Sequence, residues 1–448
     1  MLLLMSRLII CLVVSAYSCF SLAMSPERTL EGLVKDGLQG SVDIGTQLIT
    51  LEQTELAATS AYTNLLPTLS LSAGRSTSTA ESMTAGEIAK TTTTSNTAEV
   101  SGAWTLWDNY SNFRNITLAN MTKATEVIRK QSTIENYILT LLDVYFEYLL
   151  TLRRKEVLEQ QLSQSKWTHS ESMALVKAGA RTQLEALDTE IQVLNNERDL
   201  LEISQNLKVG QRNFQVLLNR GEKYEIPILN LLQLEPYFMK AFDKALPELK
   251  ARSLAAVVSQ TPDFRISKLS LDLSQERLKQ TELGYWPTTS VKISHSYNLD
   301  NYVQEEPAGG RRAGLNSTTL SLNLSWQFFD WWGTQRSIKS SQLDFQSSQL
   351  RFRDSLQSSK AKFENLIENF EVTEKSLEAS RLALLKAQKQ QEFSREMYRV
   401  GRINLLSMQQ SISRLYDAEI SYASRKKAVF MLAAKLLYYH GTTLVPAL

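Results

Sequence analysis

Cysteine is almost absent from this chain of 448 residues, and both copies, Cys11 and Cys19, lie near its N-terminus. Residues 1–23 have the form of a secretory signal peptide, in which a basic residue precedes a short apolar run that ends in small residues. Cleavage after Ala23 leaves no cysteine, which excludes disulfides and thiolate metal sites from the mature chain. In a second interpretation, residues 16–19 form a weak bacterial lipobox and Cys19 becomes a lipidated N-terminus.

Histidine is also scarce, and the three copies are far apart, at His169, His295 and His440. Their separation argues against a histidine metal site or a histidine-based catalytic triad. A glycine-rich phosphate loop is missing too, so we expect no cofactor and an energy source in a partner. The formal net charge of +2 provides no basic surface for nucleic acid.

Long hydrophobic runs are absent after residue 23, where no window reaches the roughly 18 to 20 apolar residues that a membrane helix needs. If the protein sits in a membrane, it therefore has to cross the membrane with β-strands.

The chain contains an internal repeat. The stretch AWTLWDNYSNFRNI (103–116) matches SWQFFDWWGTQRSI (325–338) at a Trp, an Asp, an Arg and an Ile, and the same offset places Gly179 on Gly401. We interpret this as a tandem duplication. The predicted parts are a signal peptide, a first repeat, a linker, a second repeat and a tail, over 1–23, 24–220, 221–247, 248–441 and 442–448.

Each repeat is predicted to contain a helix, two strands and a long helical hairpin. The predicted strands and hairpins cover 66–79, 96–107 and 110–218 in the first repeat, and 287–299, 316–329 and 333–439 in the second. In the strands, apolar and polar residues alternate, as in Leu320, Ser321 and Leu322. The polar stretches 80–95 and 300–313 are expected to be loops. Strands of about ten residues suit a tilted transmembrane strand.

The helices are expected to be very long, because neither 111–177 nor 334–400 contains proline or glycine. At 1.5 Å per residue each would measure roughly 100 Å. Apolar residues also recur at intervals of seven, which predicts side-by-side packing of a coiled-coil kind; these residues are Leu356, Phe363, Phe370, Leu377 and Leu384, then Met408, Leu415, Tyr422, Val429 and Leu436.

Aromatic residues gather where the strands meet the long helices. We expect them to mark the membrane–water boundary, which aromatic rings favour; they are Trp104, Trp107, Trp326, Phe329, Trp331 and Trp332. A soluble sandwich with an aromatic core is the competing interpretation. Four strands cannot close a membrane barrel, so the membrane interpretation requires several copies, and a trimer would supply about twelve strands with a water-filled interior.

In order and spacing, these features resemble the TolC family of bacterial outer-membrane efflux proteins. The resemblance is carried by the Leu-Pro-x-Leu opening at 66–69, the two aromatic exits before Asp108 and Asp330, and the Tyr398-x-Val-Gly401 motif. It implies a mainly α-helical fold with a membrane β-barrel part: a homotrimer with a twelve-stranded barrel in the outer membrane and a helical tunnel in the periplasm. It also implies a passive exit duct that works with a periplasmic adaptor and an inner-membrane pump of the RND or ABC type.

The resemblance assigns roles to the turns between the long helices. In the family these turns form the gate and contact the adaptor, which points to Gly179, Arg181, Gly401 and Arg402 here. The family's acidic gate positions on the second hairpin correspond to Ser407 and Gln410, so that acidic ring is missing. The equivalent positions on the first hairpin are Glu185 and Asp188, which lie on one helix face and provide an alternative ring. Alternatively, both acids are solvated surface residues.

The resemblance also implies a latch on the gate. The family closes its gate with a hydrogen bond from a tyrosine three residues before the glycine, which is Tyr398 here, to an acidic position that corresponds to Glu185. The family's nearby arginine position is Ile403 in this chain, with Arg402 one residue away, so a second bond of that kind is not expected.

Three functions compete at this point. An export duct for efflux or type I secretion requires strands with an apolar outer face and a polar lumen. A non-conducting periplasmic coiled-coil scaffold would need the helices alone. A secreted enzyme has no site in the sequence to support it. The exported substrate is not encoded in any motif.

Overall fold

The computed structural model describes most of the chain, over residues 30–84, 87–180, 182–221, 226, 246–247, 254–298, 302–306, 310–312 and 316–440. The predicted signal peptide with Cys19, the tip residue Arg181, most of the linker and the tail from 442 lie outside these residues. No helix in the described ranges has both the length and the apolar character that crossing a membrane requires.

The chain divides into two compact units, each built from both repeats. The sheet unit contains Gly45–Thr133 and Leu254–Lys362, and the hairpin unit contains Met1–Ile44, Ile134–Ser253 and Phe363–Leu448. The helices α3, α4 and α9 run from one unit into the other.

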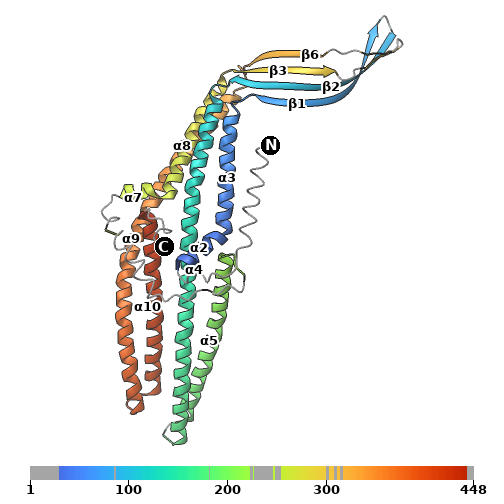
Figure 1. Cartoon of the computed structure of the whole chain (residues 1–448). Helices are drawn as coiled ribbons and strands as arrows, with labels where there is room; N and C mark the ends of the chain where they lie inside the picture. The colour runs from blue at the N-terminus through green and yellow to red at the C-terminus, as the bar shows by residue number, and fades with distance from the viewer. Residues whose placement is uncertain are drawn as a thin grey trace. The chain divides into compact units, whose positions relative to one another are not determined.

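The sheet unit holds all the described strands (Figure 1). Helix α3 (Val42–Thr63) leads into β1 (Thr68–Thr84) and β2 (Glu87–Trp107). In the second repeat α7 (Leu254–Gln260), α8 (Pro262–Glu282) and the short helix η1 (Leu283–Tyr285) lead into four further strands, which are β3 (Thr288–Asn298), β4 (Tyr302–Glu306), β5 (Gly310–Arg312) and β6 (Ser317–Ser325).

The sheet is antiparallel throughout the described strands. At the end next to the helices the strand order is β1-β2-β3-β6. At the far end β2 pairs with the short β4 in place of β3, and β4 pairs with β5. Residues far apart in the chain are thereby paired, as Trp104 is with Val291 and Val291 with Leu322. The two repeats thus form one sheet.

The two predicted loops are wrong in part. Residues 80–84 belong to β1 and 87–95 to β2, and 300–313 contain β4 and β5. Threonine is β-branched and favours strands, and two cross-strand hydroxyl pairs hold the ribbon, Thr77–Thr94 at 3.2 Å and Thr79–Thr92 at 3.3 Å. Both faces of this ribbon are polar, so it lacks the alternation of apolar and polar residues from which the other strands are predicted.

The hairpin unit is helical. It contains α2 (Leu30–Gly40), α5 (Gln183–Leu217), α10 (Leu405–His440) and the far parts of α4 (Ser111–Lys177) and α9 (Gly333–Arg399). Each of α4 and α9 has 67 residues, or about 100 Å of helix. The predicted class of long antiparallel helices with duplicated strand pairs is confirmed.

The core of the hairpin unit is aromatic and aliphatic. Tyr145 and Phe146 of α4 are at most 2% exposed, and Phe146 stacks on Phe430 of α10 with ring centroids 5.9 Å apart. Several of the predicted heptad residues are buried here, which are Phe363, Phe370, Met408, Val429 and Leu436. At the rim of this core the Lys427 ammonium of α10 lies 2.6 Å from Glu147 of α4.

Candidate functional site

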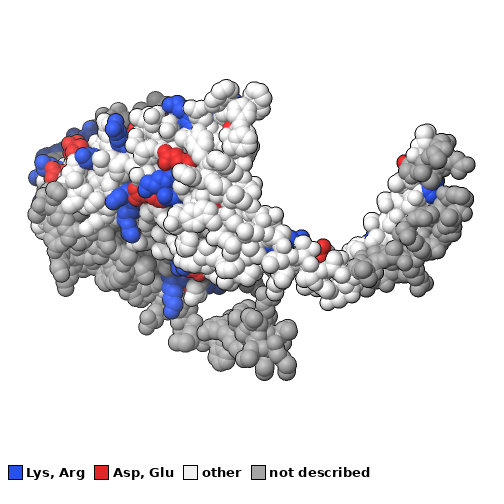
Figure 2. All heavy atoms as spheres, turned by 90° about the horizontal axis from the view of Figure 1, so that it is seen from above, with Lys and Arg blue, Asp and Glu red and all other residues white. Residues whose placement is uncertain are grey.

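The sheet has one apolar face and one polar face. Cross-strand partners project to the same face, so the pairing of Val291 with Leu322 and of Ile293 with Leu320 builds a continuous apolar surface. This surface is open to solvent in the single chain, with exposed fractions of 84% for Leu69, 72% for Leu320 and 68% for Leu322. In the view of Figure 2 charged side chains are sparse over the strands. A monomeric soluble protein rarely exposes so large an apolar area.

The opposite face carries hydroxyl groups. The Ser70 and Ser101 hydroxyls lie 2.8 Å apart across β1 and β2. An ion pair on this face joins Lys292 to Glu99 at 3.2 Å. This face can therefore contact water while the apolar face contacts hydrocarbon.

The predicted boundary aromatics lie at the end of the sheet that joins the helices. All six are 46–71% exposed. Two of them also make repeat-equivalent hydrogen bonds: the Trp104 indole donates to the Leu65 carbonyl at 2.9 Å, and the Trp326 indole to the Tyr285 carbonyl at 3.1 Å. These bonds fix two indole rings at the point where polar backbone leaves the sheet, as interfacial tryptophans require.

An aspartate follows each aromatic exit, three residues before the next helix begins. The Asp108 carboxylate accepts the Asn112 amide at 2.7 Å, and the Asp330 carboxylate accepts the Thr334 hydroxyl at 2.6 Å and its amide at 2.5 Å. Both carboxylates thereby satisfy an amide in the first turn of a helix, as a capping side chain does. The Thr334 hydroxyl and then its amide hold the pKa of Asp330 below its usual value.

Two consecutive left-handed residues follow each of these aspartates. Their φ angles are 59° and 63° at Asn109 and Tyr110, and 53° and 59° at Trp331 and Trp332. A non-glycine residue in this region costs about 1–2 kcal/mol, so the same strained turn recurs in both repeats. The sequence predicted the aromatics here but not this turn, for which the aspartate shared by both repeats was the available signal.

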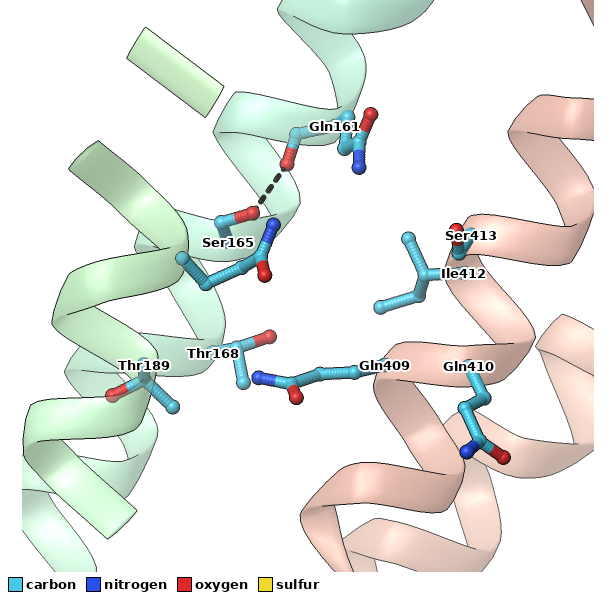
Figure 3. Close-up of a pocket in the computed structure, with 9 residues that line it drawn as sticks. Gln161, Ser165, Thr168, Thr189, Gln409, Gln410, Ile412 and Ser413 are labelled. Atoms are coloured by element: carbon cyan, nitrogen blue, oxygen red, sulfur yellow. Dashed lines mark hydrogen bonds between the residues drawn. The ribbon is translucent and has the colours of Figure 1, made fainter. Parts of the chain in front are cut away.

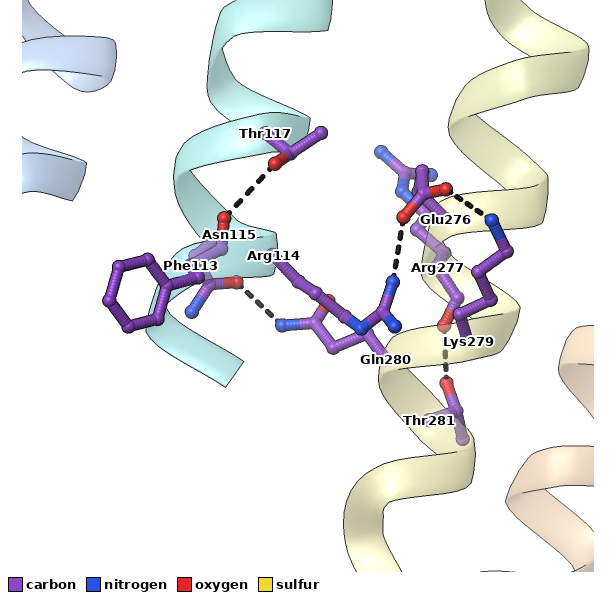
Figure 4. A network of polar contacts seen from close by, with 9 residues as sticks. All are labelled: Phe113, Arg114, Asn115, Thr117, Glu276, Arg277, Lys279, Gln280 and Thr281. Atoms are coloured by element: carbon purple, nitrogen blue, oxygen red, sulfur yellow. Dashed lines mark hydrogen bonds and ion pairs between the residues drawn. The ribbon is translucent and has the colours of Figure 1, made fainter. Parts of the chain in front are cut away.

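A polar network joins the first turns of α4 to α8 (Figure 4). The Arg114 guanidinium donates to the Glu276 carboxylate at 2.8 Å, and the Gln280 amide donates to Asn115 at 2.6 Å. Lys279, 2.6 Å from Glu276, is the first cause of the lowered pKa of that carboxyl, and Arg114 adds to it.

The two predicted tip glycines form matching turns. Gly179 and Gly401 have φ angles of +72° and +74°. After α4 the Gly179 amide donates to Val176 and the Ala180 amide to Leu175, both at 2.9 Å, and the second turn repeats this pattern. These are Schellman caps, which favour glycine at the left-handed position. Arg402 is exposed at the second tip.

The other predicted gate residues lie in different surroundings. Tyr398 is only 4% exposed, in a cluster with Val157 of α4 and Met408 of α10. The Ser407 amide donates to the Asn404 side chain at 2.9 Å, so Asn404 caps α10. Sequence reasoning missed Asn404, although an asparagine three residues before Ser407 was a usable signal.

Gln410 lines a polar cavity of about 220 Å³ in the hairpin unit (Figure 3). The cavity lies between α10 and the α4–α5 hairpin, and its other walls include Gln161, Thr168 and Gln409. Carboxamides and hydroxyls of this kind can hold water. On the first hairpin Glu185 is half-buried and Asp188 is exposed. Among the described residues, no three acids, histidines or cysteines are placed to hold a metal ion.

A sheet with one exposed apolar face, aromatic boundaries and long helical hairpins defines a channel-forming class of membrane protein. The sequence model of the family described as "Outer membrane efflux protein" matches residues 33–220 and 254–436. The chain therefore belongs to the outer membrane efflux protein family. Its function is that of an outer-membrane efflux channel of the TolC family, which is not a family of enzymes, and the predicted location in the outer membrane is confirmed.

Individual relatives are distant in sequence. The outer membrane protein TolC of Salmonella enteritidis is 21% identical over 350 residues, which are 75% of this chain and 67% of that protein. VceC of Vibrio cholerae is 12% identical with a TM-score of 0.72, over 91% of this chain and 95% of that one. The MtrE channel of Neisseria gonorrhoeae is 15% identical with a TM-score of 0.72, over 95% and 94%. The solved structures establish the fold.

Proposed function

We propose that three copies of the chain close their strands into one barrel in the outer membrane, and that their helices continue this barrel as a tunnel through the periplasm. Channels of the family are trimeric. The observation that supports the proposal most strongly is the exposed apolar face of the sheet, whose solvent exposure is unfavourable until lipid covers it.

The edges of the sheet support pairing between copies. Among the described strands, β1 pairs with β2 alone and β6 with β3 alone. In a membrane the free backbone groups of both edges need partners. Because strand directions alternate across β1-β2-β3-β6, the β6 of one copy and the β1 of the next are antiparallel, and a ring of three copies satisfies every edge. Its twelve long strands leave an interior wide enough for water.

The duct is passive and takes its energy from partners. We place it as the exit of a tripartite efflux or type I secretion system, in which a periplasmic adaptor links it to an inner-membrane pump of the RND or ABC type. The adaptor contacts the hairpin tips at Gly179, Arg181, Gly401 and Arg402. The two Schellman turns support this assignment, because they give both hairpins the same compact end.

The gate lies close to these tips. Glu185 and Asp188 of α5 form the charged constriction, three copies of each, and attract cations. Ser407 and Gln410 stand at the corresponding place on α10 and contribute no charge. Tyr398 bonds to Glu185 and holds the gate closed. The position of Tyr398, three residues before the turn glycine Gly401, supports this role.

Conductance of the purified protein in a planar lipid bilayer tests the duct. A water-filled trimer produces discrete, long-lived current steps, and its mass in detergent equals three chains. The competing scaffold predicts no steps at any protein concentration. A protein that is trimeric but never conducts in bilayers, even after both acids of the constriction are replaced by alanine, contradicts the proposal.

A further inference from the structure

The two repeats are matched almost residue by residue where strands meet helices. Asp330 follows Asp108 by 330 − 108 = 222 positions, and the left-handed pairs and first helical hydrogen bonds keep this offset. Pro287 follows Pro67 by 287 − 67 = 220 positions, which relates α8 to α3. A contact made by one repeat therefore predicts the place of its counterpart in the other.

In the first repeat one side of α4 is covered. Helix α8 packs there, with the Arg114–Glu276 pair at 2.8 Å and the Gln280–Asn115 bond at 2.6 Å. The counterpart of Arg114 on α9 is Arg336. Among the described residues, no acidic side chain lies within ion-pair distance of Arg336 or of Lys339, one turn farther along, and both are exposed.

A groove lies where the counterpart of α8 should pack. Its volume is about 540 Å³, and it is lined by Tyr285, Trp332, Arg336, Ile338 and Lys339 among others. Trp332 is 62% exposed in it. The groove thus combines an apolar floor with two cations that have no acidic partner among the described residues of the chain.

The repeat relation identifies the occupant as a copy of α3. Within one chain α3 lies on its own α4, with Glu55 3.2 Å from Lys123 and Tyr62 3.0 Å from Asn120, as α8 lies on α9 through Thr281 and Ser341 at 3.1 Å. The α3 of the same chain is therefore already engaged on one side. The missing neighbour of α9 is the α3 of another copy.

The free side of α3 fits this groove in polarity and charge. It presents Ile49, Glu52 and Leu56, with exposed fractions of 58% for Ile49 and 63% for Leu56 and an exposed Glu52. Leu56 corresponds to Glu276, since 276 − 220 = 56. The repeat relation thus places Leu56 opposite Arg336. Helix α3 runs toward the strands and α9 runs away from them. Glu52, one turn before Leu56, is therefore at the same height as Lys339, one turn after Arg336.

We propose that the groove on α9 receives α3 of a second copy, and that Glu52 of that copy pairs with Lys339 and Arg336. The proposal rests on the proposed trimer and names the residues of its contact below the strands. The charged pair sets the register between copies, while Ile49 and Leu56 cover the apolar floor beside Trp332.

Disulfide trapping tests the contact directly, because the chain has no cysteine after Cys19. The double variant Glu52→Cys/Lys339→Cys is expressed as the full chain. Outer membranes that contain it are oxidised mildly, and their proteins are separated on a non-reducing gel. We expect covalent dimers and trimers that disappear on reduction. The control pair Glu55→Cys/Lys339→Cys is expected to give at least tenfold less product, because Glu55 faces its own Lys123.

Charge exchange provides a second measurement that does not depend on thiol chemistry. Glu52→Lys should lower the temperature at which trimers dissociate on semi-native gels, and Glu52→Lys/Lys339→Glu should restore it. If the protein is a trimer by mass but shows neither the disulfide between copies nor the restored dissociation temperature, this inference is overturned and the proposed duct is left intact. Monomers by mass in the wild-type protein contradict the proposed duct itself.

Discussion

Replacing Leu320 by arginine tests whether the apolar face of the sheet contacts lipid. Leu320 is 72% exposed and pairs with Ile293 in the middle of this face, between the boundary at Trp326 and the ring of Tyr297. An arginine that faces lipid at the bilayer midplane costs about 2–4 kcal/mol. Three copies in one barrel therefore lose about 6–12 kcal/mol, which is comparable with the whole stability of many domains.

The assay compares Leu320→Arg with Thr319→Arg, its neighbour on the opposite face. Both variants add the same charge to the same strand, so differences in expression and in local strand propensity are small. We expect Leu320→Arg to be depleted from the outer membrane and to lose its heat-stable oligomer on semi-native gels, while Thr319→Arg retains both. Equal amounts of heat-stable oligomer from the two variants would refute the orientation of the sheet.

Three further predictions concern the gate, the tips and the junctions. Tyr398→Phe should raise the conductance of the closed channel in bilayers, because it removes the proposed hydrogen bond to Glu185, which would be worth about 1–3 kcal/mol; an unchanged trace argues against the latch. Gly401→Ala should destabilise its turn by about 1–2 kcal/mol, since an alanine is strained at positive φ, and lower the melting temperature, whereas Gly210→Ala, inside α5, should not. The lowered pKa of Asp330 means that its cap stabilises the fold above the unfolded carboxyl pKa of about 3.9 and is lost as pH falls through the folded value. Asp330→Asn should therefore flatten the acid limb of a melting-temperature profile between about pH 5 and 2, and an unaltered limb counts against the cap.

The long helices and the alternating strands are readable from sequence for physical reasons. Absence of proline and glycine between 111 and 177 leaves nothing to interrupt α4, and it runs over those same residues. The alternation at 319–325 places polar residues on one side and apolar residues on the other, so the strand and its two faces are predicted together. The two glycine turns were also readable, because glycine marks a left-handed residue after a helix.

Other features depend on contacts that no local pattern encodes. Thr91 and its neighbours look like a loop because both faces are polar, yet they pair with the far part of β1, where Thr91 lies opposite Ala80. Trp331 and Trp332 adopt positive φ although tryptophan has no preference for it, since the Asp330 cap and the helix after it determine the turn. The Arg395 guanidinium lies 5.0 Å from the Trp167 ring on another helix, a pairing that sequence spacing cannot reveal.

Images of single particles of the detergent-purified protein, taken by electron cryomicroscopy, test the central claim most directly. The account predicts a threefold particle in which a micelle-covered barrel opens into a hollow helical stalk along one continuous axis. A particle made of a single chain, or a threefold particle whose strands lie outside the micelle, would contradict it.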